Sequence, residues 1–473
     1  MKRFFQFIIL VLPFVSFTGN DSGYSIKIKI KGLKDTVCYF GNYYGDKQYV
    51  RDTAKVDVNG NLIFSGKEKL GGGIYLVVLP SKKYFELIID KEQTFSIETD
   101  TVDLVSNMKV KGSDDNVLFY KYTNYIGGKA KEVEVIKSKL EKTKNKDSVA
   151  LCQKQLSKID EDVKNYKLNY IKEHPQTFLA KVFTASQDPV VPKEIPLLPN
   201  GKKDSTFPYR YYKSHYFENV DLTDDRLLRT PIVYNKVKYY LEKLTMQSPD
   251  SIIKEADWLI SKTGGNKETF KYLIYYCTYN YETSTIMGMD AVFVHMVEKY
   301  YMTGKAYWAD STQLAKITNR ALILKPLLLG KQTPKLTLPD SLDKMVSLYD
   351  VKAKYTILVF WDPECGHCKT VIPKLKTFYD KYKSKNVQVY AVNIEPNIDE
   401  WKKYIKDHNL DWINTSNANK KGEAYYFLKQ MYDVYSTPVI YVLDENKKII
   451  AKRIDVENLY QILDRLLKIP PTK

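Results

Sequence analysis

Cysteine is scarce in this sequence, with five residues among 473. A chain of this length with so few cysteines is not a scaffold held together by disulfides. The sequence also contains no run of eighteen or more apolar residues, which excludes a membrane protein with several spanning helices. Because 44% of the residues are hydrophobic and 27% are charged, the chain is not disordered, and its length predicts about two to four globular domains.

Arginine is sparse as well. The formal net charge is +17, from 73 basic and 56 acidic residues, but most of the basic residues are lysines interleaved with acids. Arginine, which favours phosphate and base recognition, occurs only sporadically, as at Arg226, Arg229 and Arg320. We therefore predict no nucleic-acid partner, and expect peripheral association with an anionic membrane as the one consequence of the lysine-rich surface.

The first nineteen residues have the composition of an export signal. Lys2 and Arg3 precede an apolar stretch over residues 4–17, and small residues follow it. The stretch does not alternate as a half-buried strand would, and no cysteine follows it as in a lipoprotein. The sequence thus predicts a signal peptide over residues 1–19, either cleaved or kept as an anchor, and a location in the periplasm or cell envelope.

Three patterns divide the rest of the chain. Short alternating runs predict an antiparallel β-sandwich domain at residues 20–108, with a hairpin turn at Asn59-Gly60. Helical periodicity follows and predicts an α-helical domain at residues 109–325. Strands alternate with helices over residues 326–473, which predicts a C-terminal α/β domain. The expected fold class is therefore multidomain.

Three of the five cysteines lie in apolar patterns. Cys38 falls within an expected strand, Cys152 belongs to a helical seam, and Cys277 shares a helix face with other apolar residues. All three are predicted to be core residues. The tyrosines around the proline-rich stretch 189–208 fit either a contact surface for a partner or glycan, or simple packing.

The other two cysteines belong to the tetrad Cys-Gly-His-Cys at residues 365–368. It lies between an apolar strand and an amphipathic helix, which places Cys365 at the N-terminus of a helix. Unpaired N–H groups and the helix dipole stabilise a thiolate there, and the thiolate is the nucleophile of disulfide exchange. A zinc site would need two more ligands, for which only His408 and Cys277 are candidates, so we expect no metal.

Two segments of the C-terminal domain resemble a known family. The segment Phe-Trp-Asp-Pro-Glu-Cys-Gly-His-Cys at residues 360–368, with Pro373 five positions later, resembles the active-site segment of thioredoxin-fold proteins, most closely the exported TlpA/ResA-like branch. The segment Ser-Thr-Pro-Val at 436–439 resembles the cis-proline segment of that fold. A strand and helix between them, at 387–408, are similar to an insertion of the branch. The resemblance implies a thioredoxin-like domain at 326–473.

The resemblance also implies roles for single residues. Cys365 would attack a disulfide and Cys368 would resolve the mixed disulfide, so the two form the redox-active disulfide. Trp361, Thr437 and Pro438 would bind the substrate chain. No cofactor is implied.

The sequence departs from the family pattern at several positions. Val359 stands six residues before the first cysteine, where thioredoxins have a buried Asp. Glu395 lies near the active-site Glu of ResA-like proteins, and is either a proton shuttle for Cys368 or an exposed loop carboxylate. Next to the nucleophile, Glu364 is expected to raise its pKa and His367 to lower it.

The hypothesis from the sequence is an exported thiol–disulfide oxidoreductase, acting as a reductase on disulfides of envelope proteins and supplied by a membrane thiol electron donor. The upstream segments resemble uncharacterised modules that precede TlpA-like domains in envelope proteins of Bacteroidetes. One alternative is an envelope binding or scaffold protein whose thioredoxin-like domain is structural. A second is a peroxidase of the same fold, but the peroxidase pattern Pro-x-x-x-Thr-x-x-Cys is absent.

Overall fold

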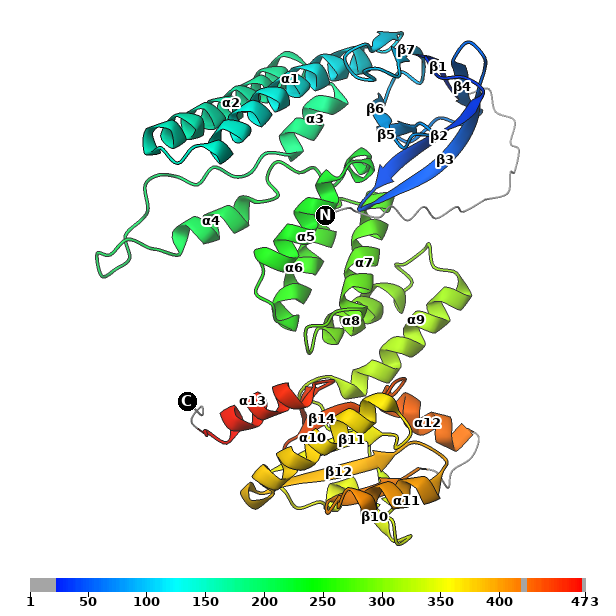
Figure 1. The fold of residues 1–473 in the computed structure, drawn as a ribbon, viewed down its shortest axis with the longest axis vertical. Helices are drawn as coiled ribbons and strands as arrows, with labels where there is room; N and C mark the ends of the chain where they lie inside the picture. The colour runs from blue at the N-terminus through cyan, green and yellow to red at the C-terminus, as the bar shows by residue number, and fades with distance from the viewer. Residues whose placement is uncertain (1–22, 418–422, 470–473) are drawn as a thin grey trace. The chain divides into compact units, whose positions relative to one another are not determined.

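The computed structural model describes residues 23–417 and 423–469, so the predicted signal peptide at 1–19 lies outside the described residues. The chain divides into two compact units, one formed by residues 1–246 and 258–272, the other by residues 247–257 and 273–473 (Figure 1). Within the described residues, no helix is both long and apolar enough to cross a bilayer.

The first unit begins with two four-stranded sheets, ordered β4-β1-β7-β8 and β3-β2-β5-β6. Their strands are β1 Tyr24–Lys31, β2 Thr36–Tyr44, β3 Lys47–Val56, β4 Asn61–Gly66, β5 Gly73–Val78, β6 Tyr84–Ile89, β7 Thr94–Asp100 and β8 Lys109–Lys111. Alternation places every second side chain inside, as with Ile26, Ile28 and Ile30 of β1. The inward side chains of both sheets form one core, so the predicted sandwich is confirmed. The pairing of β1 with β7 is parallel, and the other pairings in these two sheets are antiparallel.

The turn at Asn59-Gly60 forms, but it does not make the predicted hairpin. The Asp57 carboxylate accepts hydrogen bonds from the N–H groups of Asn59 and Asn61 at 2.9 and 2.7 Å, and Gly60 adopts a φ of +83°. The strands on either side then diverge, because β3 pairs with β2 whereas β4 pairs with β1. β3 and β4 therefore belong to different sheets, and each contributes apolar side chains to the common core.

Helices follow the sandwich. They are α1 Asp114–Lys142, α2 Lys146–Glu173, α3 Phe178–Ala185, α4 Phe207–His215, η1 Asp225–Arg229, α5 Ile232–Lys243, α6 Pro249–Ser261, α7 Lys267–Glu282, α8 Asp290–Met296, η2 Val297–Tyr301, α9 Ser311–Leu324 and η3 Lys325–Leu327. The first two form an antiparallel hairpin, and Ile136, Cys152 and Ile159 are buried between them, which agrees with the place of Cys152 in an apolar helical seam. Their N-termini are capped by the side chains of Ser113 and Asn145.

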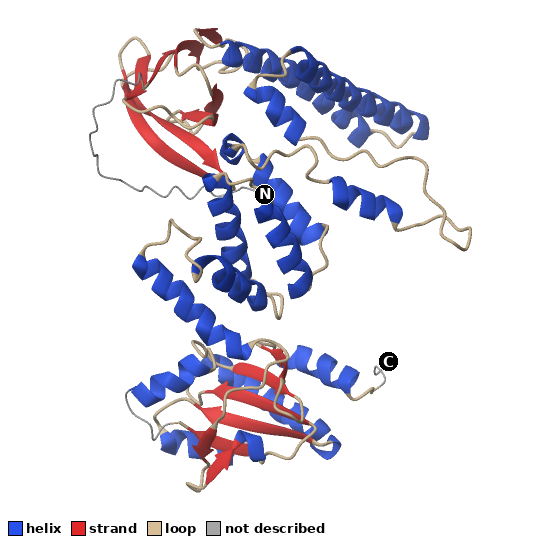
Figure 2. Cartoon of the chain, turned by 180° about the vertical axis from the view of Figure 1, so that it is seen from behind, coloured by secondary structure: helices blue, strands red, loops and turns tan. Residues whose placement is uncertain are grey.

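The C-terminal α/β domain lies in the second unit. Its elements are β9 Thr337–Pro339, β10 Met345–Ser347, η4 Leu348–Asp350, β11 Tyr355–Trp361, α10 Gly366–Tyr382, η5 Lys383–Lys385, β12 Val387–Asn393, α11 Ile398–Asp407, β13 Ile413–Ser416, α12 Glu423–Met431, β14 Val439–Leu443, β15 Ile449–Lys452 and α13 Val456–Leu466. Five strands form its sheet in the order β13-β12-β11-β14-β15. Figure 2 shows the strands of this sheet in red, with helices in blue around them.

Both faces of this sheet are covered, which explains why β11 reads as an unbroken apolar run. Alternate residues Ile357, Val359 and Trp361 pack with α10, α11 and α13 in one core. The residues between them, Leu358 and Phe360, pack with α12 and the β9–β10 hairpin in a second core. The sheet therefore holds the end of β11, where the cysteine tetrad begins, between two cores.

Candidate active site

The cysteine tetrad lies where β11 ends and α10 begins. Cys365 occupies the N-cap position of α10, as the sequence predicts, and its N–H donates to the Asp362 carbonyl at 3.3 Å. Its side chain is partly exposed, whereas Cys368, one turn later, is fully buried. Both are free thiols in the structure. One sulfur therefore faces solvent and the other lies beneath it.

The two thiols have opposite pKa shifts. Burial raises the pKa of Cys365, but hydrogen bonds from the Thr437 side chain, from Cys368 and from the His367 backbone outweigh it, so the pKa lies below its ordinary value. Burial, together with the negative charge of Cys365, raises the pKa of Cys368 to about 12. Cys365 is thus the more readily ionised thiol of the pair, and Cys368 the one that keeps its proton.

The second predicted segment packs against the first. The Thr437–Pro438 peptide bond is cis, in agreement with the resemblance, and the Thr437 carbonyl oxygen lies 3.5 Å from the Cys365 sulfur. A cavity of about 370 Å³ opens beside Thr437. Residues that line this cavity include Asp362, Glu395, Lys429, Tyr435, Ser436 and Thr437.

Glu395 lines this cavity from the segment that follows β12. Its backbone is fixed by the buried Asn393, whose amide donates to the Glu395 carbonyl at 2.8 Å and accepts from the Glu395 N–H at 3.1 Å. Burial first, and then the negative charges of Asp362 and Glu364, raise the pKa of its carboxyl, while Lys429 opposes them. Glu395 thus shares a cavity with Thr437, the residue whose carbonyl lies 3.5 Å from the Cys365 sulfur, and its role as a proton shuttle stays a prediction.

Trp361 requires a correction. We expected this residue to bind substrate, but its side chain is fully buried, because it lies on the inward side of β11. Its ring packs 5.2 Å from that of Tyr404 on α11, and it leaves no surface for a substrate chain. Trp361 is therefore a core residue that packs with Cys368.

The position of the missing thioredoxin carboxylate is apolar. Val359 is fully buried in the same core as Cys368. A polar group in the same core that sequence reasoning missed is Tyr404, whose pKa is raised by burial and by the Cys368 charge. Its hydroxyl has no hydrogen-bond partner among the described residues. The amphipathic pattern of α11 contained the signal, since it placed Tyr404 on the inward face.

The other predicted residues fall at the rim or in the cores. Glu364 and His367 are exposed beside Cys365, and their predicted effects on its pKa stay predictions. Cys38, Cys152 and Cys277 are buried, as expected for core residues. Among the residues that the structure describes, no three His, Cys, Asp or Glu side chains gather as they would around a metal ion.

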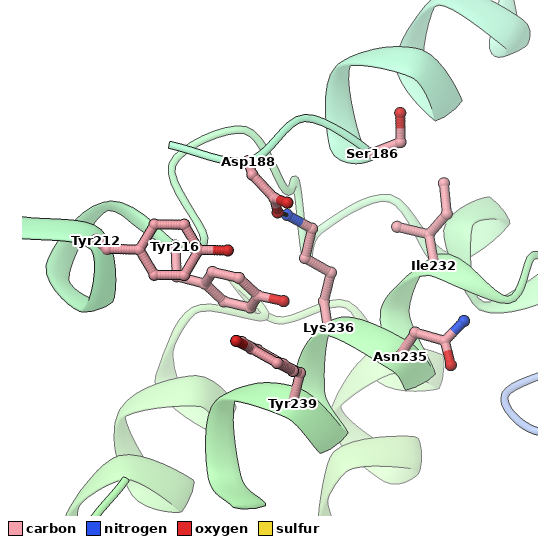
Figure 3. Close-up of a pocket in the computed structure, with 8 residues that line it drawn as sticks. All are labelled: Ser186, Asp188, Tyr212, Tyr216, Ile232, Asn235, Lys236 and Tyr239. Atoms are coloured by element: carbon pink, nitrogen blue, oxygen red, sulfur yellow. Dashed lines mark hydrogen bonds and ion pairs between the residues drawn. The ribbon is translucent and has the colours of Figure 1, made fainter. Parts of the chain in front are cut away.

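A second cavity, of about 440 Å³, lies among the tyrosines of the helical region (Figure 3). Tyr212, Tyr216 and Tyr239 surround the ion pair of Lys236 with Asp188, whose atoms are 2.9 Å apart. The buried Lys236 ammonium also donates to the Gln187 carbonyl and lies 4.4 Å from the Tyr216 ring. The charged groups here thus satisfy one another, so packing accounts for these tyrosines without a ligand.

Comparison with known families assigns the C-terminal domain. Residues 329–452 match the AhpC/TSA family, residues 139–325 match the domain of unknown function DUF5106, and residues 24–119 match another, DUF4369. The thiol-disulfide oxidoreductase ResA of Bacillus cereus is 27% identical over 143 residues, which cover 30% of this chain and 79% of the relative. The C-terminal domain is an AhpC/TSA thioredoxin-like domain whose homologues include ResA/TlpA-like thiol–disulfide oxidoreductases.

Two further proteins are similar to this domain. The sporulation thiol-disulfide oxidoreductase A of Bacillus subtilis is 30% identical over 22% of this chain and 61% of its own. A crystal structure of a domain of a possible thiol-disulfide isomerase from Cytophaga hutchinsonii is 47% identical, with a TM-score of 0.28, and covers 30% of this chain and 95% of that one. The predicted family, fold class and enzyme class are confirmed.

Proposed function

We propose that this chain is an exported reductase of the cell envelope that transfers two electrons from the Cys365–Cys368 dithiol to the disulfide of a protein substrate. The observation that carries the proposal is the pair of unlike thiols beside the cis Thr437–Pro438 bond. A reactive thiolate and a protonated, buried partner are what a two-step exchange requires.

The reaction begins at Cys365. Its thiolate attacks one sulfur of the substrate disulfide, that disulfide breaks, and a mixed disulfide forms while the first substrate thiolate leaves and takes up a proton. Cys368 then loses its proton and attacks the Cys365 sulfur. The second substrate thiol is released, and the enzyme is left with a Cys365–Cys368 disulfide.

The second step needs a base, because burial alone keeps the pKa of the Cys368 thiol above its ordinary value once Cys365 has lost its charge in the mixed disulfide. With Val359 in the core, the described residues offer no carboxylate in the thioredoxin position. We assign the proton transfer to Glu395, whose raised pKa brings its proton exchange closer to neutral pH. Glu395 shares a cavity with Thr437, and we expect water in this cavity to carry the proton.

The same proposal specifies how the substrate chain binds and where in the cell the protein acts. The Thr437–Pro438 segment would hold the substrate backbone beside Cys365, with Tyr435 and Ser436 exposed at the rim. The N-terminal composition and the ResA relative support export to the envelope. A thiol donor in the membrane would reduce the enzyme disulfide after each turnover.

Reduction of insulin disulfides by dithiothreitol, catalysed by the purified chain, tests the proposal. Cys365→Ala should abolish catalysis, since no other described cysteine is exposed. Cys152→Ala, which removes a buried thiol of α2, is the matched control and should retain it. Equal turnover by the wild type and Cys365→Ala would refute the proposed function.

A further inference from the structure

The segment that carries Thr437 and Pro438 is fixed at its start by a buried carboxylate. Asp433 is 1% exposed and lies between the end of α12 and this segment. Two arginines bind it. Arg453 donates to its carbonyl at 2.5 Å and to its carboxylate, and Arg320 binds both carboxylate oxygens, with Nη2 at 3.2 Å from Oδ2. Paired N–H donors of this kind fix orientation as well as charge.

Arg320 comes from outside the thioredoxin-like domain. It lies on α9, within the residues that match DUF5106, and 113 positions before Asp433 in the sequence. In Figure 1, α9 runs down to the C-terminal domain. The same guanidinium lies 5.8 Å from the Tyr435 ring centroid and 3.7 Å from the Glu282 carboxylate. One side chain therefore contacts Asp433, the exposed Tyr435 and a helix of the preceding region.

The segment from Asp433 to Pro438 ends next to the nucleophile Cys365. Asp433 and Thr437 are four residues apart, and Tyr435, Ser436 and Thr437 all line the active-site cavity. The Thr437 carbonyl lies 3.5 Å from the Cys365 sulfur, and the Thr437 side chain is one of the groups that hold down the pKa of Cys365. A shift of this segment would change both contacts.

We propose that Arg320 is a positioning residue for the redox site: it holds the segment from Asp433 to Pro438 so that Thr437 stays against Cys365. The helical region upstream thereby controls the reactivity of a nucleophile that it does not touch. The catalytic significance of this inference rests on the proposed function, but the alkylation measurement that tests it does not.

The test is the pH dependence of Cys365 alkylation by iodoacetamide in the reduced full chain. Arg320→Met should raise the apparent pKa of Cys365 by about one unit, which lowers its thiolate fraction at neutral pH about tenfold and, after the gain in nucleophilicity, slows labelling about three- to fourfold. Arg320→Lys keeps the charge but not the paired donors, so it should fall between the wild type and Arg320→Met. Lys325→Met breaks an exposed ion pair with Glu298 at the end of the same helix and should label as the wild type does.

A second variant separates positioning from stability. Arg320→Met leaves a buried carboxylate short of a partner, which can weaken folding. The double variant Arg320→Met/Asp433→Asn removes that charge and should fold, yet it should keep the raised pKa of Cys365 because the link to α9 is still missing. If the folded double variant labels with the wild-type pH profile, Arg320 is only a structural ion pair and the inference fails. Absence of insulin reduction by the wild type would refute the proposed function alone, because the alkylation comparison needs no turnover.

Discussion

Selective alkylation of the reduced chain is the sharpest consequence of the two cysteine environments. The pKa of Cys368 is about 12, whereas that of Cys365 lies below the ordinary value of 9.0. At pH 7, the thiolate fraction is then about 10⁻⁵ for Cys368 and at least about 10⁻² for Cys365, a ratio of about a thousand. The Cys368 thiolate is the more basic one and therefore the better nucleophile. For a pKa difference of about three units and a Brønsted slope of about 0.4–0.5, this advantage is about 15- to 30-fold.

The net preference for Cys365 is therefore at least about 30-fold, before the burial of Cys368 adds to it. Iodoacetamide labelling followed by peptide mass spectrometry measures each cysteine separately. Burial raises the pKa of Cys38 to about 11 and that of Cys277 to about 12, so both should also label slowly. In guanidinium chloride all five cysteines should react alike, which is the control. Labelling of Cys368 at a rate comparable to Cys365, or half-maximal labelling of Cys365 above pH 9, would show that the reasoning is wrong.

Three further predictions follow from the site and the fold. Cys368→Ala should accumulate a mixed disulfide between Cys365 and insulin, visible on non-reducing gels, because the resolving thiol is gone; an absence of the adduct would contradict the assigned order of attack. Resolution by the wild type should speed up with pH as Glu395 ionises above its unshifted pKa of 4.5, and Glu395→Gln should lose this rise. Identical stopped-flow profiles for the two proteins would remove Glu395 from the mechanism. Asn116→Ala should lower the free energy of unfolding by about 2–4 kcal/mol, since it orphans a buried N–H and carbonyl of β6, whereas the exposed Asn124→Ala should change the urea midpoint little.

Local pattern was enough to predict the cysteine site. The apolar run that becomes β11 and the amphipathic pattern of α10 placed Cys365 at a helix N-terminus, and the structure has it at the N-cap. Both signals come from residues close in sequence, where periodicity and capping rules apply directly. The Thr437–Pro438 segment was found through resemblance, because a tertiary contact across 72 residues leaves no periodic trace.

Features that depend on contacts between residues far apart in the chain could not be predicted from the sequence. Trp361 stands in the family motif, but only the sheet shows that its side of β11 faces the buried core. The Asn59-Gly60 turn was predicted correctly, yet whether the strands beside it pair is decided by which sheet each one joins. The bond between Arg320 and Asp433 spans 113 positions and two sequence families, and nothing near either residue indicates the other.

The reduction potential of the Cys365–Cys368 pair tests the central claim most directly. It is measured on the full chain equilibrated in glutathione and dithiothreitol buffers, with Cys365→Ala as the control that lacks the couple. A reversible two-electron transition near that of thioredoxin, about −270 mV, is the result expected of a reductase. A value of about −120 to −180 mV, or a disulfide that resists reduction in both buffers, would contradict the account.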